Sequence, residues 1–363
     1  MELLLRVMKR QITLAAIAQE SQVSLSTVSL VLRNKPGIPS ETRQRVLDAA
    51  KRLGYNQSVH QGNRHLPSNR STNKLQRLGV MVKTEPDLPP AANPFYSHVL
   101  DGIADACRRQ KINLLYAHLP VDEYNHPIDE MPGIVSQEQV DGLLLVGMFL
   151  NEPFGNIIRE KSLDVVLVDA YSADDMYDAV LSDNQWGARA AVHHLIQMGH
   201  RHIGIVGSQS DAYPSIRERR TGYLQVINEH NLPNPYFADC ELNKIDASQA
   251  TIELLQQHPQ ISALFGCNDE VAITAIRAAE MLGRRVPDDL SVIGFDDIDL
   301  AQHITPALST MYVDKIEMGR LAVQLLINRF EFPQSGQVRA LLRPRLIARQ
   351  STQEHTPIGS LGD

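Results

Sequence analysis

The sequence predicts an all-α helix-turn-helix head joined to an α/β body of parallel sheets flanked by helices. Three observations support this fold class. Helical periodicity fills residues 12–55, a polar stretch without apolar periodicity follows at 56–77, and short apolar runs then alternate with amphipathic stretches to about residue 350. A chain of 363 residues is too long for one compact domain and suits a small head with a two-lobed body.

Three short helices are expected in the head. Thr13 is an N-cap candidate before the first helix, and Ser24 is one before the second, whose apolar face carries Val28 and Val31. A third helix is expected after Pro39. Two short helices joined by a tight turn form a helix-turn-helix. A three-helix bundle that contacts another protein is the alternative.

The distribution of charge favours nucleic acid as the partner of the head. Residues 1–77 hold 13 Lys and Arg against 4 Asp and Glu, whereas the remaining chain holds 22 against 38. A basic head on an acidic body is expected where only the head meets phosphate. In and before the second helix, Ser24, Ser26, Thr27 and Ser29 supply hydroxyls for phosphates. The sequence therefore predicts double-stranded DNA as a partner.

Apolar runs and helical stretches alternate twice through the body. The runs lie at residues 78–82, 112–116, 142–146 and 165–168, and then at 203–206, 263–265 and 291–293. Continuous apolar strands that alternate with helices indicate parallel sheets covered on both faces. Two series in tandem predict two lobes, with a ligand cleft at the carboxyl ends of the strands.

Polar side chains collect directly after these runs. They are Asp169, Asp183, Asn184, Asn268, Asp269, Asp296 and Asp297. Carboxylates and amides in an interlobe cleft suit a polyhydroxylated ligand, because each buried hydroxyl needs a partner. Each of them could instead cap the helix that follows. Trp186, the sole tryptophan, is expected either to stack on the ligand or to pack in the core.

No sequence signature of an enzyme is present. The chain has no GxxxxGK[ST], HExxH or GxSxG motif, and Gly204 and Gly207 lack the GxGxxG spacing. Adjacent histidines at 193–194 and 200–202 point in different directions, so they do not converge on one metal ion. We therefore expect no catalytic residue, cofactor or metal. A sugar-binding transport protein, or an enzyme with an appended DNA-binding head, is the alternative.

Cysteine usage and the N-terminal stretch favour a cytoplasmic protein. Cys107, Cys240 and Cys267 lie far apart without metal-ligand spacing, which indicates reduced thiols. The start MELLLRVMKRQ has a short leucine run, but two basic residues follow at once and no small-residue cleavage site appears. It predicts neither a signal peptide nor a membrane span, and Met8 is an alternative start.

The segment from Val23 to Asn34, with Pro39 to Arg43 and Leu53 to Tyr55, resembles the DNA-binding headpiece of the LacI/GalR family of bacterial transcription regulators. The similarity extends to about residue 350. It implies a two-lobed, periplasmic-binding-protein-like (type I) effector domain and a repressor that binds a near-palindromic operator. The effector is expected to be a sugar, with a purine or nucleoside as the alternative. Because no leucine heptad follows Arg349, we expect a homodimer rather than a tetramer.

The resemblance also implies roles for single residues of the head and linker. Positions that read bases are Leu25, Ser26 and Leu30, and positions that hold phosphates are Thr13, Ser24, Thr27, Asn34 and Thr42. Many relatives carry Arg where this chain has Leu30, which can touch a thymine methyl but cannot make the bidentate contact to guanine. In the linker, Leu66 is either a wedge for the minor groove or part of a flexible segment.

For the effector, the resemblance implies contacts from Phe95 on one lobe and from Arg219, Asn268, Asp269 and Asp296 on the other. Together with the strand-end pattern, this gives the domain organisation. We expect a DNA-binding head at 1–57, a hinge or linker at 58–77, an effector-binding and dimerisation body at 78–350, and a disordered tail at 351–363.

Overall fold

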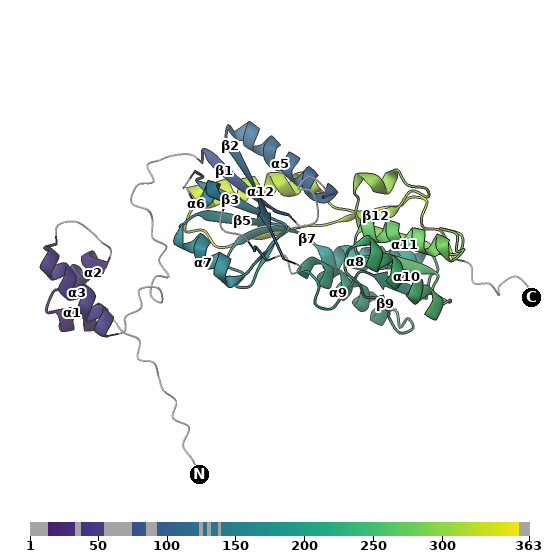
Figure 1. The fold of residues 1–363 in the computed structure, drawn as a ribbon, viewed down its shortest axis with the longest axis horizontal. Helices are drawn as coiled ribbons and strands as arrows, with labels where there is room; N and C mark the ends of the chain where they lie inside the picture. Colours follow the sequence, from purple (N-terminus) through teal and green to yellow (C-terminus); the bar gives the residue numbers. More distant parts are fainter. Residues whose placement is uncertain are drawn as a thin grey trace, which may run out of the picture. The chain divides into compact units, whose positions relative to one another are not determined.

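The computed structural model of the chain describes residues 14–32, 38–53, 75–84, 93–122, 126–128, 132–136 and 139–355. It divides into two compact units, Met1–Ser71 and Thr72–Asp363. Figure 1 shows the small helical unit and the larger α/β unit. Within the described ranges, no helix has the length and apolar character needed to cross a bilayer.

The small unit is a three-helix head. It consists of α1 (Leu14–Ser21), α2 (Leu25–Leu32) and α3 (Ser40–Arg52). Gln22 takes a left-handed conformation with φ of 53° in the turn between α1 and α2, which makes that turn tight. The apolar positions that the sequence places at helical spacing meet in one core of Ile17, Val28, Val31, Val46, Ala49 and Ala50. The predicted helix-turn-helix head is confirmed.

The first lobe of the body is a six-stranded parallel sheet in the order β13-β7-β5-β3-β1-β2. Its strands are β1 (Arg77–Thr84), β2 (Asn113–Pro120), β3 (Gly142–Val146), β5 (Asp164–Val168), β7 (Asp178–Ser182) and β13 (Arg339–Leu342). A short pair, β4 (Phe149–Leu150) and β6 (Tyr171–Ser172), lies beside it.

Helices cover both faces of the first sheet (Figure 1). One face packs on α5 (Pro94–Gln110) and α12 (Lys315–Glu331), and the other on α7 (Glu152–Glu160), with the single turn α6 (Gly133–Ser136) near β2. α5 and α12 approach closely because Gly102 and Gly319 face each other's backbone, where an added Cβ would collide with Ile316 O and Val99 O.

The second lobe repeats the arrangement with the strand order β14-β12-β11-β10-β8-β9, in which only β14 is antiparallel. Its strands are β8 (Ile203–Val206), β9 (Tyr236–Ala238), β10 (Ala263–Gly266), β11 (Ser291–Asp296), β12 (Ser309–Tyr312) and β14 (Arg345–Ile347). Helices α8 (Asn184–Gln197) and α9 (Pro214–Glu229) cover one face; α10 (Lys244–Gln257) and α11 (Asp269–Met281) cover the other.

The chain passes three times between the lobes. It leaves the first sheet after β7, returns after β12 to form α12, and leaves again between β13 and β14. The predicted pair of α/β lobes is therefore confirmed, and the last segments complete both sheets rather than one. A short 3-10 helix, η1 (Asp299–Gln302), follows β11.

The predicted tail begins too early. Ser351 is fully buried, donates a hydrogen bond to Val292 O at 2.6 Å and accepts one from Ser309 N at 2.8 Å. Thr352 Oγ1 lies 2.8 Å from Ser309 Oγ, and His355 N donates to Met198 O at 2.7 Å. Residues 351–355 are thus part of the second lobe, held by hydrogen bonds rather than by the apolar contacts that a pattern reveals. Residues 356–363 lie outside the described part.

Candidate functional site

The described part of the candidate DNA surface lies on α2. Leu25 and Leu30 expose 54% and 41% of their surface, although both are large apolar residues on an eight-residue helix. Exposed large apolar residues that lie together can mark a surface that contacts a partner. In a DNA groove, an apolar side chain can contact thymine methyl groups. The exposure of Leu25 and Leu30 therefore favours the base-contact role expected for them.

The Ser24 hydroxyl at the start of α2 also has a structural role. Ser24 Oγ accepts a hydrogen bond from Thr27 N at 3.1 Å and lies 2.8 Å from Thr27 Oγ1, so Ser24 caps the helix. Thr42 is half-buried in the first turn of α3. Thr13, Asn34 and Leu66 lie outside the described residues, as do the side chains of Ser26 and Ser29.

In the body, buried polar side chains from both lobes meet at the carboxyl ends of the strands. We call this set the polar cluster. It consists of Tyr96, Asp169, Arg219, Asp269, Asp296 and Lys315. Asp169 follows β5 of the first lobe and Asp296 ends β11 of the second, so the sheets deliver their polar residues to the edge that the sequence predicts.

Arg219 is the hub of the cluster on the second lobe. It is almost completely buried in α9, and its guanidinium donates to Asp296 Oδ1 at 3.1 Å, to Asn184 Oδ1 at 3.0 Å and to Cys267 O at 2.5 Å. The same group lies 3.8 Å from the centroid of the Phe295 ring. Together these partners fix the plane of the guanidinium and use three of its five N–H groups.

Asp169 is the hub on the first lobe. It is buried in a left-handed conformation with φ of 47°, and Tyr96 OH donates to its Oδ2 at 3.1 Å. Its Oδ1 is also buried but has no hydrogen-bond partner among the described residues. Burial raises the pKa of Asp169 to about 7. The charge of Arg219 lowers this pKa, and the charge of Asp296 raises it further. Asp169 Oδ1 is therefore available to accept a hydrogen bond from a ligand.

Asn268 and Asp269 serve the protein's own backbone. Asn268 Oδ1 accepts from Val271 N at 2.8 Å, which is the capping role weighed as the alternative for this residue. Asp269 is fully buried and accepts from Thr310 Oγ1 at 2.5 Å and from Ile298 N at 2.8 Å. Burial raises the pKa of Asp269 well above its ordinary value. Asp269 thus ties the start of α11 to β12 and to the residues after β11.

Phe95 lies at the cluster and Trp186 does not. Phe95 is buried at the start of α5, and the ammonium of Lys315 lies 5.8 Å from its ring centroid. Trp186 is 36% exposed, and its described ring partner is Arg343, 4.9 Å from the ring centroid. Asp183 instead caps the helix by accepting a hydrogen bond from Trp186 N at 3.2 Å.

Two cluster residues and one bridge were missed by the sequence analysis. Lys315 Nζ donates to Asp296 O at 2.5 Å and to Asp297 O at 3.0 Å. Tyr96 bonds to Asp169, and Tyr213 OH bridges the lobes by donating to Met148 O at 2.9 Å and Asp169 O at 3.1 Å. For Tyr96, the NPFY segment offered a signal, because it also contains Phe95. For Lys315 there was none, because its position depends on where the chain crosses between the lobes.

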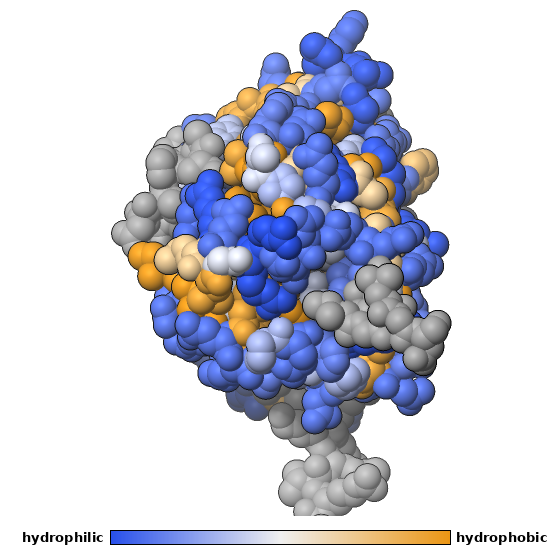
Figure 2. All heavy atoms as spheres, turned by 90° about the vertical axis from the view of Figure 1, so that its right-hand side faces the viewer, coloured by the Kyte–Doolittle hydropathy of each residue, from blue (hydrophilic) through white to orange (hydrophobic). Residues whose placement is uncertain are grey.

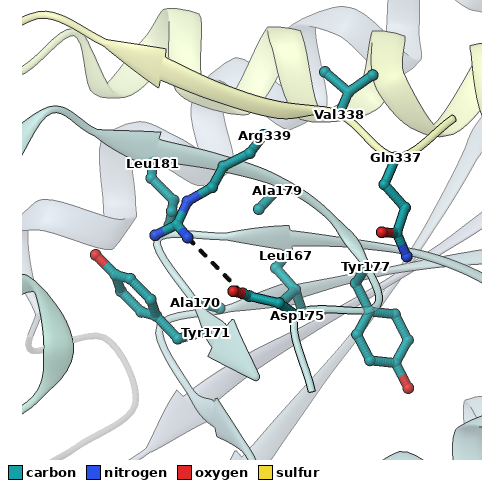
Figure 3. A pocket seen from close by; sticks show the side chains of 10 residues that line it. All are labelled: Leu167, Ala170, Tyr171, Asp175, Tyr177, Ala179, Leu181, Gln337, Val338 and Arg339. Atoms are coloured by element: carbon teal, nitrogen blue, oxygen red, sulfur yellow. Dashed lines mark ion pairs between the residues drawn. The ribbon is translucent and has the colours of Figure 1, made fainter. Parts of the chain in front are cut away.

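A separate cavity of about 180 Å³ opens on the first lobe (Figure 3). Its floor is apolar, and the Arg339 guanidinium pairs with Asp175 across it at 3.8 Å. Tyr171 OH, which lines the cavity, donates to Glu218 at 3.1 Å, and Glu218 also accepts from Asn184 at 3.0 Å. The predicted effector residues do not line this cavity; hydrogen bonds through Asn184 connect it to the polar cluster.

The histidine pairs bind neighbours rather than a common ion. His193 Nδ1 lies 3.2 Å from His230 Nε2, whereas His194 Nε2 lies 3.4 Å from Thr352 Oγ1. Across the ranges that the structure describes, no three His, Cys, Asp or Glu side chains are grouped as metal ligands. The polar cluster itself offers hydrogen bonds and charged groups to a ligand.

Two family models match the chain. Residues 13–58 match bacterial regulatory proteins of the lacI family, and residues 192–352 match a periplasmic binding protein-like domain. The ribose operon repressor of Haemophilus influenzae is 30% identical over 93% of this chain and 98% of its own length. The HTH-type transcriptional repressor PurR of Aliivibrio salmonicida is 27% identical over 94% of this chain and 99% of its own length.

A solved structure with the same fold supports this similarity. A LacI family transcriptional regulator from Enterococcus faecium, with bound ribose, superposes with a TM-score of 0.65 and 25% identity. The match covers 77% of this chain and all of that chain. This structure matches about three quarters of the chain, whereas the two repressors match nearly all of it, including the head.

Proposed function

This chain belongs to the lacI family of bacterial regulatory proteins, and from that membership we propose that it represses transcription by binding a near-palindromic DNA operator under the control of a small-molecule effector. The observation that carries the proposal is the polar cluster, in which Asp169 of one lobe and the Arg219–Asp296 pair of the other meet in a chain with a basic helical head. A ligand bound there would contact both lobes.

In the head, the proposal assigns the exposed face of α2 to DNA. Base contacts come from Leu25, Ser26 and Leu30, and phosphate contacts come from Thr13, Ser24, Thr27, Ser29, Asn34 and Thr42. Residues 58–77 link the head to the body, and Leu66 enters the minor groove when the linker engages DNA. Because phosphate contacts dominate affinity, binding to any duplex should weaken as salt increases.

In the body, the proposed effector contacts are Phe95, Asp169, Arg219 and Asp296. Asn268 and Asp269, which the resemblance also implies, are proposed to support the site through the hydrogen bonds described above. A sugar is the effector class best supported, because two carboxylates, a guanidinium and a flat aromatic ring satisfy the hydroxyls and the apolar face of a sugar. The Enterococcus relative binds ribose, and the name of the Aliivibrio relative points to purines, so a purine is the second candidate. The effector regulates only if it binds one relative orientation of the lobes better than the other.

A homodimer is the proposed assembly. Leu114 and Tyr116 are exposed on the edge strand β2, and Ile245 and Met281 of the second lobe are 81% and 74% exposed. Figure 2, which faces the second lobe, shows hydrophobic areas on a mainly hydrophilic surface. These side chains offer apolar contact to a second copy, and residues 101–109 of α5 are proposed to add polar contacts. A two-fold dimer matches a near-palindromic operator. Sedimentation should give a dimer; a stable tetramer would contradict this assembly.

The body is proposed to bind its ligand without converting it. Carboxylates and amides occupy the cluster, and its described residues present no nucleophile paired with a base. Ligand recovered unchanged after long incubation with the protein is the expected result. Steady loss of ligand, proportional to protein concentration, would favour an enzyme with an appended DNA-binding head.

The pocket assignment is tested by thermal-shift screening against sugars, sugar phosphates and purines. The protein is compared with Asp296→Asn and Arg219→Lys, which keep the size or the charge of the side chain but change its hydrogen bonds. Arg285→Lys is the control, because Arg285 makes a similar pair with Asp289 on the surface. A stabilising ligand should lose its effect in the two cluster variants only. A ligand retained equally by both variants would refute the assignment.

A further inference from the structure

Lys315 is a buried ammonium group at the polar cluster whose hydrogen bonds go to backbone carbonyls rather than to carboxylates. It is the first residue of α12, is 5% exposed, and reaches Asp296 and Asp297 only through their backbone carbonyls, at 2.5 and 3.0 Å. An ammonium group has three N–H donors, and these two carbonyls use two of them. Carbonyl oxygens satisfy the donors without cancelling the positive charge.

The carboxylates around Lys315 are committed elsewhere. Asp296 pairs with Arg219 at 3.1 Å, and Asp297 pairs with Arg349 at 2.7 Å. Asp299, which is mostly exposed, pairs with His98 at 3.2 Å. Asp269 is fully buried and already accepts hydrogen bonds from Thr310 and Ile298; burial raises its pKa well above the ordinary value, although these two hydrogen bonds oppose the rise.

The opposite side of the cluster adds further positive charge. Lys83, near the end of β1, places its ammonium 6.0 Å from the Tyr96 ring centroid and 5.8 Å from that of Tyr213. The carboxyl that faces it, Asp169, has a pKa of about 7 and is therefore only partly ionised at neutral pH. Lys83, Arg219 and Lys315 thus bring three basic side chains to the cluster from both lobes.

We propose that Lys315 makes the effector site selective for anionic ligands, namely a sugar acid or a sugar phosphate. The anionic group lies between Lys315 and the remaining N–H groups of Arg219, whereas the hydroxyls bond to Asp296 and to the free Oδ1 of Asp169. This inference rests on the proposed function of the polar cluster as the effector site. One additional charge-assisted hydrogen bond in a buried site corresponds to about 10-fold or more in affinity.

Matched ligand pairs test the inference by titration calorimetry with the full-length protein in phosphate-free buffer. The pairs are D-galacturonate with D-galactose, D-glucuronate with D-glucose, and D-ribose 5-phosphate with D-ribose, so the carboxylate and phosphate arms are separate. The acid of at least one pair should bind about 10-fold or more tightly than its neutral partner. Lys315→Arg should keep this preference, and Lys315→Met should abolish it while retaining the neutral ligand.

Lys244→Met is the matched control, since Lys244 also begins a helix, α10, but is exposed. The preference of the Lys244→Met variant for the acid over its neutral partner should equal that of the unchanged protein. The inference is overturned if no acid binds more tightly than its partner, including the case in which none of the six binds. It is also overturned if Lys315→Met keeps the preference. Tight binding of a neutral sugar alone would reject the role of Lys315 and leave the proposed function standing.

Discussion

Arg219 and Asp296 form a buried ion pair, with 3.1 Å between the guanidinium nitrogen and the carboxylate oxygen. The pair joins α9 to the end of β11, next to the carboxyl of Asp169 on the other lobe. Burial makes the pair sensitive to the loss of one partner, because the remaining charge would be left in the protein interior. The polar cluster therefore contributes to stability as well as to binding.

Asp296→Ala should lower the free energy of unfolding by about 3–5 kcal/mol, since Arg219 would remain buried without its carboxylate. Urea denaturation at pH 7.5 measures the change. The control is Asp289→Ala, which removes the partner of Arg285 at the surface and should cost less stability because water screens that pair. Equal losses in the two variants would show that the Arg219–Asp296 pair is not shielded from water.

Asp169→Asn should change how stability depends on pH. Because the pKa of Asp169 is raised to about 7 in the folded protein, the folded state keeps a proton that the unfolded chain releases near pH 4. This contribution to stability is present at low pH and is lost as the pH rises through about 7. From pH 5 to pH 8, the unchanged protein should lose about 2–3 kcal/mol relative to Asp169→Asn. Parallel pH profiles would contradict the raised pKa.

Substitutions of Ser24 should distinguish its role as the N-cap of α2 from its proposed contact with a DNA phosphate. Ser24→Asp keeps an acceptor for Thr27 N but places a negative charge where a phosphate is expected. Hydrogen exchange of α2 should stay unchanged, and affinity for every duplex should fall. Ser24→Ala should cost the helix about 1 kcal/mol and speed exchange. If Ser24→Asp binds DNA as well as the unchanged protein, Ser24 holds no phosphate.

Truncation after Gln350 should destabilise the body, and truncation after His355 should not. The first removes the hydrogen bonds of Ser351 and Thr352 to buried groups of β11 and β12. At about 1 kcal/mol for each bond, these three alone should lower the free energy of unfolding by about 3 kcal/mol, and the lost backbone hydrogen bond from Val292 N to Ser351 O adds to this. Denaturant titrations of both truncated forms measure this. Equal stability of the two forms would mean that residues 351–355 add nothing.

Hydrophobic patterning predicted the elements of the fold well. The run at 142–146 is the fully buried strand β3, and the run at 291–293 lies in β11, because a strand covered on both faces must be apolar throughout. The segment 351–355 escaped prediction for the complementary reason. Its serine and threonine are held by hydrogen bonds to neighbouring strands, which leave no periodic signal in the sequence.

The site was predicted in part for a similar reason. Asp169, Arg219 and Asp296 were expected because strand ends and local motifs mark them, and the structure brings them together. Lys315 reaches them only because the chain recrosses between lobes, an arrangement that no local spacing encodes. Trp186 follows Asp183 closely, yet the helical turn directs its ring to Arg343.

The central claim is that ligand bound to the body controls sequence-specific DNA binding by the head. The most direct measurement is fluorescence anisotropy of the intact protein on a duplex selected from random sequences and on a scrambled duplex, with and without a ligand found by thermal shift. The selected duplex should bind at least about 1,000-fold more tightly than the scrambled one, and the ligand should change that affinity alone. Equal affinity for both duplexes, unaffected by the ligand, would contradict the account.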